Sequence, residues 1–243
     1  PENRLAVAEK IYHQIAGRKV SLATPILINL RVPGGNLSSC FITAIDDSLD
    51  NIFYNISAIA QISKNGGGVG VNLSRIRAAG GEIRSVPNAS GGVIPWIKIV
   101  NDTAVAVNQL GKRSGAVTVA LDVWHRDIED FLELQTENGD QRKKAYDLFP
   151  QVVIPDLFME RVKANKDWML FDPDEVKRLH QTSLADLWGA EFEKTYLRLE
   201  VDPNMVLAKK VSARDLFKRI MKSQLETGMP YLFFKDTVNQ ANP

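Results

Sequence analysis

The chain has 243 residues, of which 44% are hydrophobic and 24% are charged, and 30 basic against 29 acidic side chains give a formal net charge of +1. These values are typical of a soluble globular protein with one or two domains. The near-neutral charge excludes the global basic field of a dedicated nucleic-acid binder. No run of about 20 apolar residues predicts a membrane span, and the N-terminus lacks a signal-peptide pattern.

Apolar residues recur with helical or strand spacing along the first third of the chain. We expect an amphipathic helix over 2–16, a strand over 26–30 and a helix that begins at Asp47 and ends at Gly66. A strand over 69–73 should then lead into a long loop that contains many glycines.

The same spacing continues to the end of the chain, and 182–202 is expected to form a helical excursion from the sheet. Apolar strands that alternate with amphipathic helices predict an α/β fold with a largely parallel sheet. The later predicted elements are a helix from Pro95 to Val107, a strand over 116–123, a helix over 126–134, a strand over 152–154, a helix over 156–163, a strand over 168–171, a helix that begins after Ser212 and ends at Gly228, and a strand over 231–234.

Glycines and basic residues are concentrated in one segment. Ten of the 16 glycines lie between 66 and 115, where six Lys or Arg side chains face two acidic ones. Turns and a solvated surface would explain each feature separately, but together they favour an anion-binding region. Neither familiar phosphate motif accounts for it. Val71 replaces the third glycine of a dinucleotide fingerprint, and Ala106 replaces the first glycine of a Walker loop.

Cys40 is the single cysteine, which excludes an intrachain disulfide and a zinc site with several thiolates. A lone cysteine is more often a small buried hydrophobe than a nucleophile, and no histidine is singled out as its base. His125 is better explained as a residue that orients a helix end. The acids of 127–129 and 172–174 are expected at helix starts, and no spacing indicates a metal site.

Nine ordered motifs resemble the large, catalytic subunit of class I ribonucleotide reductase, most closely its class Ib-like or phage-like branch. The match extends over essentially the whole chain. The motifs are Ala-Thr-Pro at 23–25, SSCF at 38–41, DSL at 47–49, SKNGGGVG at 63–70, SRIR at 74–77, SGGVIP at 90–95, NQLGKRSG at 108–115, WHRDI at 124–128 and GMPYLFFKDTVNQANP at 228–243.

The resemblance implies a ten-stranded α/β barrel of the thiyl-radical enzyme type, built from two antiparallel five-stranded halves. This chain would be the first half, as one partial domain over 1–243. The regulatory N-terminal region and the C-terminal half-barrel would be absent. Because the first residue is Pro1 rather than Met, a processed chain or a fragment is also expected from the sequence itself.

The family reduces the 2′-hydroxyl of ribonucleotides, usually diphosphates, by radical chemistry. Cys40 matches its substrate-reducing cysteine, which forms a disulfide with a distant second cysteine after each turnover. Thr24, Ser39 and Gly68 match substrate-binding positions. The resemblance therefore implies ribonucleoside-diphosphate reductase activity with Cys40 as the catalytic residue contributed here.

The family also has a specificity site for a deoxynucleoside triphosphate or ATP, which is expected with Mg²⁺. Asp47, Ser48 and Leu49 match its first segment, and Arg77 and Arg84 match its phosphate-binding arginines. The helices over 49–64 and 95–108 match those that pair across the family's homodimer. The loop that reports effector identity to the substrate pocket is matched by Gln109, Leu110, Gly111, Lys112, Arg113, Ser114 and Gly115.

Further partners follow from the resemblance. A small subunit with a dimetal centre would supply the radical, and a thioredoxin- or glutaredoxin-type protein would supply electrons. No covalently bound cofactor, nucleic acid or membrane is expected. The single cysteine and the missing signal indicate a reducing, cytoplasmic environment.

The sequence ends at Pro243, just before the family's Asn-x-Cys-x-Glu segment would begin. A split gene, an intervening element or a truncation would each explain this boundary. We therefore expect the chain to be inactive until the C-terminal half complements it.

Two alternatives stay open. One is a catalytically inert module for nucleotide binding or assembly, and the other is a fragment of a cobalamin-dependent class II reductase. A Cys40→Ser change tests the first alternative, because in an enzyme it should abolish reconstituted activity and leave effector binding intact. A requirement for adenosylcobalamin would reveal the second.

Overall fold

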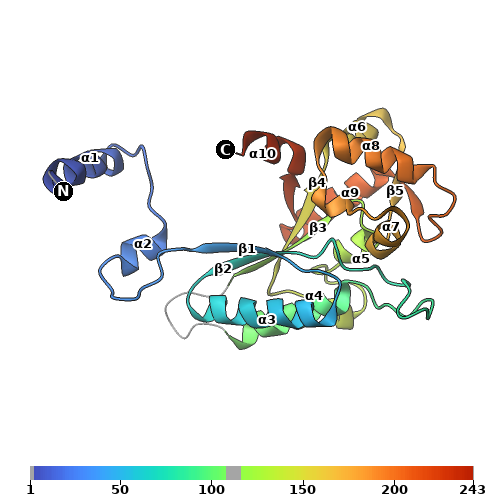
Figure 1. Ribbon diagram of the computed structural model, residues 1–243, viewed down its shortest axis with the longest axis horizontal. Coiled ribbons are helices and arrows are strands. Elements are labelled where there is room, and N and C mark those ends of the chain that lie inside the picture. Colours follow the sequence, from blue (N-terminus) through green and yellow to red (C-terminus); the bar gives the residue numbers. More distant parts are fainter. Residues whose placement is uncertain (1–2, 108–115, 243) are drawn as a thin grey trace.

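The computed structural model describes residues 3–107 and 116–242. Its centre is a five-stranded sheet in which all paired neighbours are parallel (Figure 1). This confirms the predicted α/β fold, and five parallel strands are the number expected for one half of the barrel. In spatial order the strands are β1 (Cys40–Ala44), β2 (Gly68–Asn72), β3 (Val117–Asp122), β4 (Phe149–Ile154) and β7 (Tyr231–Phe234).

Parallel neighbours require crossover connections, and helices provide them here. Two long helices form a layer beneath one face of the sheet, as Figure 1 shows. The elements between the first four strands are α3 (Leu49–Lys64), α4 (Ile94–Ala106), α5 (Ile128–Phe131) and the 3-10 helix η1 (Gln141–Lys143).

Helix α3 shows how the sequence sets the element boundaries. Ser48 is its N-cap and accepts a hydrogen bond from the Asn51 amide at 3.2 Å. The predicted start at Asp47 was therefore one residue early, because the Asp47 carboxylate pairs with Arg77 instead. Gly66 follows the helix at φ 82°, in the left-handed conformation that ends many helices, as predicted.

The two faces of the sheet have different environments. On the face that packs against α3 and α4, alternate residues of β2 and β3 such as Val71 and Val119 are buried in one continuous core. On the other face β1 presents Cys40 and Ile42 to solvent, and Ile42 is 90% exposed. The edge strand β1 thus has one packed face and one open face.

A long excursion separates β4 from β7, and it includes the helical region predicted over 182–202. The expected sheet strand over 168–171 is instead β5 (Asp167–Leu170), which pairs antiparallel with β6 (Lys209–Ser212) in a separate two-stranded sheet. Trp168 of β5 stacks on Tyr196 with ring centroids 4.2 Å apart, so the excursion has aromatic packing of its own. Its helices are α6 (Asp156–Ala164), α7 (Pro173–His180), η2 (Leu184–Asp186), α8 (Gly189–Glu200) and α9 (Ala213–Thr227).

The chain ends lie outside the sheet. Helix α1 (Arg4–Ala16) confirms the first predicted helix but buries no residue, and α10 (Lys235–Ala241) follows β7. The strand predicted over 26–30 was wrong, because Thr24–Asn29 forms helix α2 with Pro25 in its first turn. A short apolar run cannot be assigned to strand or helix by spacing alone.

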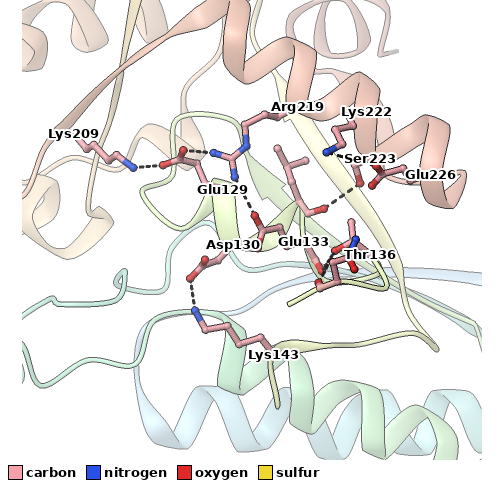
Figure 2. A network of polar contacts seen from close by, with 12 residues as sticks. Glu129, Asp130, Glu133, Thr136, Lys143, Lys209, Arg219, Lys222, Ser223 and Glu226 are labelled. Carbon is pink, nitrogen blue, oxygen red and sulfur yellow. Dashed lines mark hydrogen bonds and ion pairs between the residues drawn. The ribbon is translucent and has the colours of Figure 1, made fainter. Parts of the chain in front are cut away.

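Ion pairs attach α5 to the excursion, as Figure 2 shows. Glu129 accepts hydrogen bonds from both Lys209 of β6 and Arg219 of α9. Arg219 also reaches Glu133 at 3.3 Å, and Lys143 of η1 pairs with Asp130 at 3.0 Å. The helix predicted over 126–134 is only four residues long, but these contacts hold the segment around it in place.

Candidate functional site

The predicted site residues lie at opposite ends of the parallel strands. Cys40 begins β1, whereas Asp47 and Arg77 follow the carboxyl ends of β1 and β2. A five-residue strand spans roughly 15 Å, so the two groups are separated by about the length of the sheet.

At the amino end the structure brings together three of the four substrate-matching residues. Cys40 is opposite Gly68 in the strand register, and the Gly68 amide donates to the Ser39 carbonyl at 2.7 Å. The Cys40 Sγ atom lies 3.3 Å from the Ser39 hydroxyl, and the cysteine is exposed. A Cβ atom on Gly68 would meet its nearest neighbours at an ordinary 3.6 Å. Packing among the described residues therefore does not require glycine there.

Two other predictions at this end have different outcomes. Thr24 is exposed at the start of α2, and within the described ranges no hydrogen bond joins it to Ser39, Cys40 or Gly68. The predicted loop of residues 109–115 lies outside the described residues.

At the carboxyl end, a cavity of about 520 Å³ gathers all five residues that match the effector site. Its wall has a polar part and an apolar part that is completed by Trp96, whose ring meets Phe53 edge-on at 6.2 Å. The size and the mixed wall suit a nucleotide, which has a charged and an apolar end. The lining residues are Asp47, Ser48, Leu49, Ile52, Arg77, Ile83, Arg84, Ser90, Gly91 and Trp96.

Arg77 is held between carboxylates in the polar part of this cavity. Its Nε donates to Asp47 at 2.6 Å, its Nη2 lies 3.5 Å from Asp174, and its Nη1 donates to the Glu82 carbonyl. Burial raises the pKa of Asp47, and the hydrogen bond from Arg77 offsets part of that effect. Asp174 was predicted only as a helix-start acid, and its contact with Arg77 could not be seen in the sequence.

Arg84 contrasts with Arg77. Its backbone φ is 48° and that of Ser85 is 64°, so the loop turns sharply there. In the structure of 3–107 and 116–242, no carboxylate or carbonyl pairs with the Arg84 guanidinium, although it lines the cavity. A free guanidinium has the forked donors that bind phosphate oxygens in pairs.

The loop that carries both arginines is anchored by side chains that sequence reasoning assigned to helix ends. His125 orients a helix end, as predicted, because its Nδ1 accepts from the Asp127 amide at 3.1 Å. Asp172 caps α7, as predicted, through the Glu175 amide at 2.7 Å. Asp127 stands at a helix start, as predicted, in the N-cap position of α5, but its carboxylate makes no cap hydrogen bond and binds the amides of Ala79 and Val93 instead.

The described residues offer neither a metal-binding cluster nor a helix that could span a membrane. No group of three or more His, Cys, Asp or Glu side chains among them could hold a metal ion. None of the helices they form is long and apolar enough to cross a bilayer.

Comparison with known proteins decides the family. A family model described as the ribonucleotide reductase barrel domain matches residues 38–243. The chain belongs to the ribonucleotide reductase family. Its five-stranded parallel sheet is accordingly part of a ribonucleotide reductase barrel domain.

Individual relatives agree with this family. The chain is 60% identical to ribonucleoside-diphosphate reductase subunit alpha of Synechocystis and 43% identical to that of Treponema pallidum, over 100% of its length in both cases. It is 44% identical to the large subunit of Arabidopsis thaliana over 94% of its length. The matches span 32%, 29% and 28% of these relatives, so the chain corresponds to about a third of their length.

Proposed function

We propose that the chain is part of a ribonucleoside-diphosphate reductase catalytic subunit and carries its nucleotide effector site. The observation that supports this most is the cavity at the carboxyl end of the sheet, which gathers Asp47, Ser48, Leu49, Arg77 and Arg84 from separate segments. The 60% identity to a ribonucleoside-diphosphate reductase subunit alpha supports the reaction.

Cys40 is proposed to supply one of the two reducing thiols. Replacing the 2′-hydroxyl by hydrogen releases water and oxidises two thiols to a disulfide, which accounts for two electrons and two protons. The sequence has one cysteine, so the second thiol must come from another segment of the assembled enzyme. The exposed position of Cys40 on the open face of β1 leaves its thiol accessible to a ribose.

The effector nucleotide is proposed to lie with its triphosphate towards Arg77 and Arg84 and its base towards Leu49 and Trp96. The unpaired guanidinium of Arg84 offers donors without breaking an existing ion pair. Mg²⁺ bound to the triphosphate would neutralise part of its charge.

Assembly is part of the same proposal. Leu49, Phe53 and Tyr54 of α3 are exposed, which supports a homodimer through α3 and α4. The radical is proposed to come from a dimetal small subunit, and electrons from a thioredoxin- or glutaredoxin-type protein. A cytoplasmic location is part of the same proposal, and the single cysteine supports it.

A chimera tests the reaction. The corresponding third of the Synechocystis alpha subunit would be replaced by this chain and assayed with its small subunit and a dithiol reductant. We expect reduction of ribonucleoside diphosphates, loss of activity in Cys40→Ser, and unchanged effector binding in that variant. A chimera that binds nucleotides but never reduces them would contradict the proposal and favour a binding module.

A further inference from the structure

Arg77 lies in a loop that leaves β2 after Asn72 and enters α4 at Ile94. Within the loop, backbone pairing consists of the isolated bridges Ala79–Gly91 and Ile83–Val86 and a few turn hydrogen bonds. Such a loop alone would not fix the direction of an arginine side chain. Its position must be determined by contacts from other segments.

The carbonyl on the amino-terminal side of Arg77 is held by a buried histidine. His125 is 0% exposed, and its Nε2 lies 2.8 Å from the Ile76 carbonyl oxygen. Because Nδ1 accepts a hydrogen bond from the Asp127 amide, the ring hydrogen is on Nε2 and is donated to Ile76.

The two amides on the carboxyl-terminal side are held by buried carboxylates. Asp172, 1% exposed, accepts from the Ala78 amide at 2.6 Å. Asp127, 6% exposed, accepts from the Ala79 amide at 3.0 Å. Three backbone contacts thus flank Arg77, one before it and two after it, and each comes from a side chain 48 to 94 positions away from the residue that it contacts.

Asp127 also joins the two ends of the loop. Its second oxygen accepts from the Val93 amide at 3.0 Å, beside Gly92. Gly92 has φ +74°, and a Cβ atom there would lie 2.2 Å from that oxygen. The absence of a side chain at Gly92 therefore lets one carboxylate bind both Ala79 and Val93.

We propose that His125, Asp127 and Asp172 are positioning residues that hold Arg77 in the geometry required by the effector triphosphate. None of the three lines the cavity, so they act through the backbone on either side of Arg77. Fixing this backbone before binding lowers the entropic cost of ordering the loop around the ligand. The inference rests on the proposed function, because it assumes that the cavity binds a nucleotide.

The test compares two buried carboxylates with the same chemistry. Asp127→Asn keeps the shape, but a side-chain NH2 group replaces one carboxylate oxygen and therefore faces a backbone N–H that this oxygen accepted from. Asp236 offers a matched control: it is 8% exposed and accepts from the amides of Asp156 and Gly189 at 2.7 and 2.8 Å. Asp236→Asn therefore disturbs a similar pair of buried hydrogen bonds, but away from the cavity.

Dissociation constants of dTTP and thymidine would be measured by calorimetry with the full 243-residue chain and both variants. We expect Asp127→Asn to weaken dTTP binding about tenfold, because the loop that carries Arg77 loses about one hydrogen bond. Thymidine binding should weaken much less, because thymidine has no phosphate. Asp236→Asn should leave both constants unchanged. The selective loss of triphosphate affinity is a result that a general loss of stability would not produce.

Three other outcomes separate the hypotheses. Equal dTTP affinity in the wild type and Asp127→Asn, with weaker binding in Arg77→Ala, would overturn the positioning role alone. Equal losses in Asp127→Asn and Asp236→Asn would overturn it as well. No dTTP binding by the wild type would overturn the proposed function and this inference with it. If Asp127→Asn does not fold, Asp172→Asn is judged by the same criteria.

Discussion

The two ends of the central sheet differ in how firmly their functional groups are held. At the carboxyl end, Arg77 contacts two carboxylates and a carbonyl, and buried side chains hold its backbone on both sides. At the amino end, Cys40 is exposed, and among the described residues only the side chain of Ser39 lies at hydrogen-bond distance from it.

This contrast follows from the chemistry expected of each end. A site for a charged ligand gains from donors that are fixed in advance, since reorganising them on binding costs free energy. A thiol that must meet a substrate and later a reductant gains from access. The carboxyl end is therefore organised within this chain, whereas the amino end presents its thiol on an open strand face.

The largest expected effect tests the packing at the carboxyl end. Gly92→Ala places a methyl group 2.2 Å from the Asp127 carboxylate and 2.6 Å from the Ala79 amide. We expect it to lower the free energy of unfolding by about 3 kcal/mol. Gly228→Ala has a similar φ but open space around it, and should cost about 1 kcal/mol. Denaturant unfolding measures both changes. Equal losses of stability in the two variants would contradict close packing between Gly92 and Asp127.

The next effect separates two neighbouring arginines. Arg77→Ala should weaken dTTP binding by about 10- to 100-fold, because charge-assisted hydrogen bonds contribute about 1.5–3 kcal/mol. Arg75→Ala is the matched control, since Arg75 also bridges two carboxylates, Asp46 and Asp186, but does not line the cavity. Calorimetric titration should show little change for Arg75→Ala. A comparable loss in both variants would mean that the loop acts only as a charged surface.

A smaller effect concerns the pH dependence of stability at the same end. Burial raises the pKa of Asp122, although Lys235 lies 3.8 Å away and opposes the shift. Because the folded state holds this proton more tightly than the unfolded state, stability falls as pH rises from about 4 through the folded pKa. Relative to Asp122→Asn, the wild type should lose about 1.4 kcal/mol for each unit by which the pKa is raised.

Unfolding curves between pH 3 and 8 measure this slope. Asp140→Asn tests a pH dependence of the opposite sign, because the hydrogen bond from Arg142 lowers the pKa of Asp140 at the surface. The stabilisation that ionised Asp140 gives to the folded state is present above the pKa of the unfolded state and is lost as pH falls. Parallel wild-type and Asp122→Asn curves would show that Asp122 has no raised pKa.

The smallest effect is expected at the amino end. Cys40→Ser should change the free energy of unfolding by less than about 0.5 kcal/mol, because the side chain is exposed. Binding of dTTP should be unchanged, since the cavity is at the other end of the sheet. The wild-type thiol should react rapidly with a thiol reagent. A large loss of stability in the variant would show that Cys40 is a packed residue after all.

Much of the fold could be predicted because local patterns determine it. The spacing of apolar residues located β2, β3, β4 and β7 of the main sheet but not β1, and Ser212 and Gly228 marked the ends of α9 correctly. Thr24–Asn29 was wrongly predicted to include a strand, because six residues are too few to distinguish helical from strand spacing. The pairing of β5 with β6 was missed because register between distant segments has no local signal.

In the candidate sites, too, the local features were predictable and the long-range contacts were not. Motif resemblance named the five residues that the cavity brings together. It could not show that Asp127 and Asp172 bind loop amides 48 and 94 positions away, because nothing near them in the sequence differs from an ordinary helix start. The positions of functional side chains were thus predictable, whereas the buried groups that hold them were not.

Trp96 gives the cavity a property that makes these questions easy to measure. The chain has four tryptophans, all within the described residues, and of these Trp96 alone lines the cavity. Trp124 and Trp168 are buried in the core, and Trp188 lies on the excursion. Occupancy of the cavity should therefore change the emission of one indole against a constant background, so that intrinsic fluorescence reports binding without an attached label.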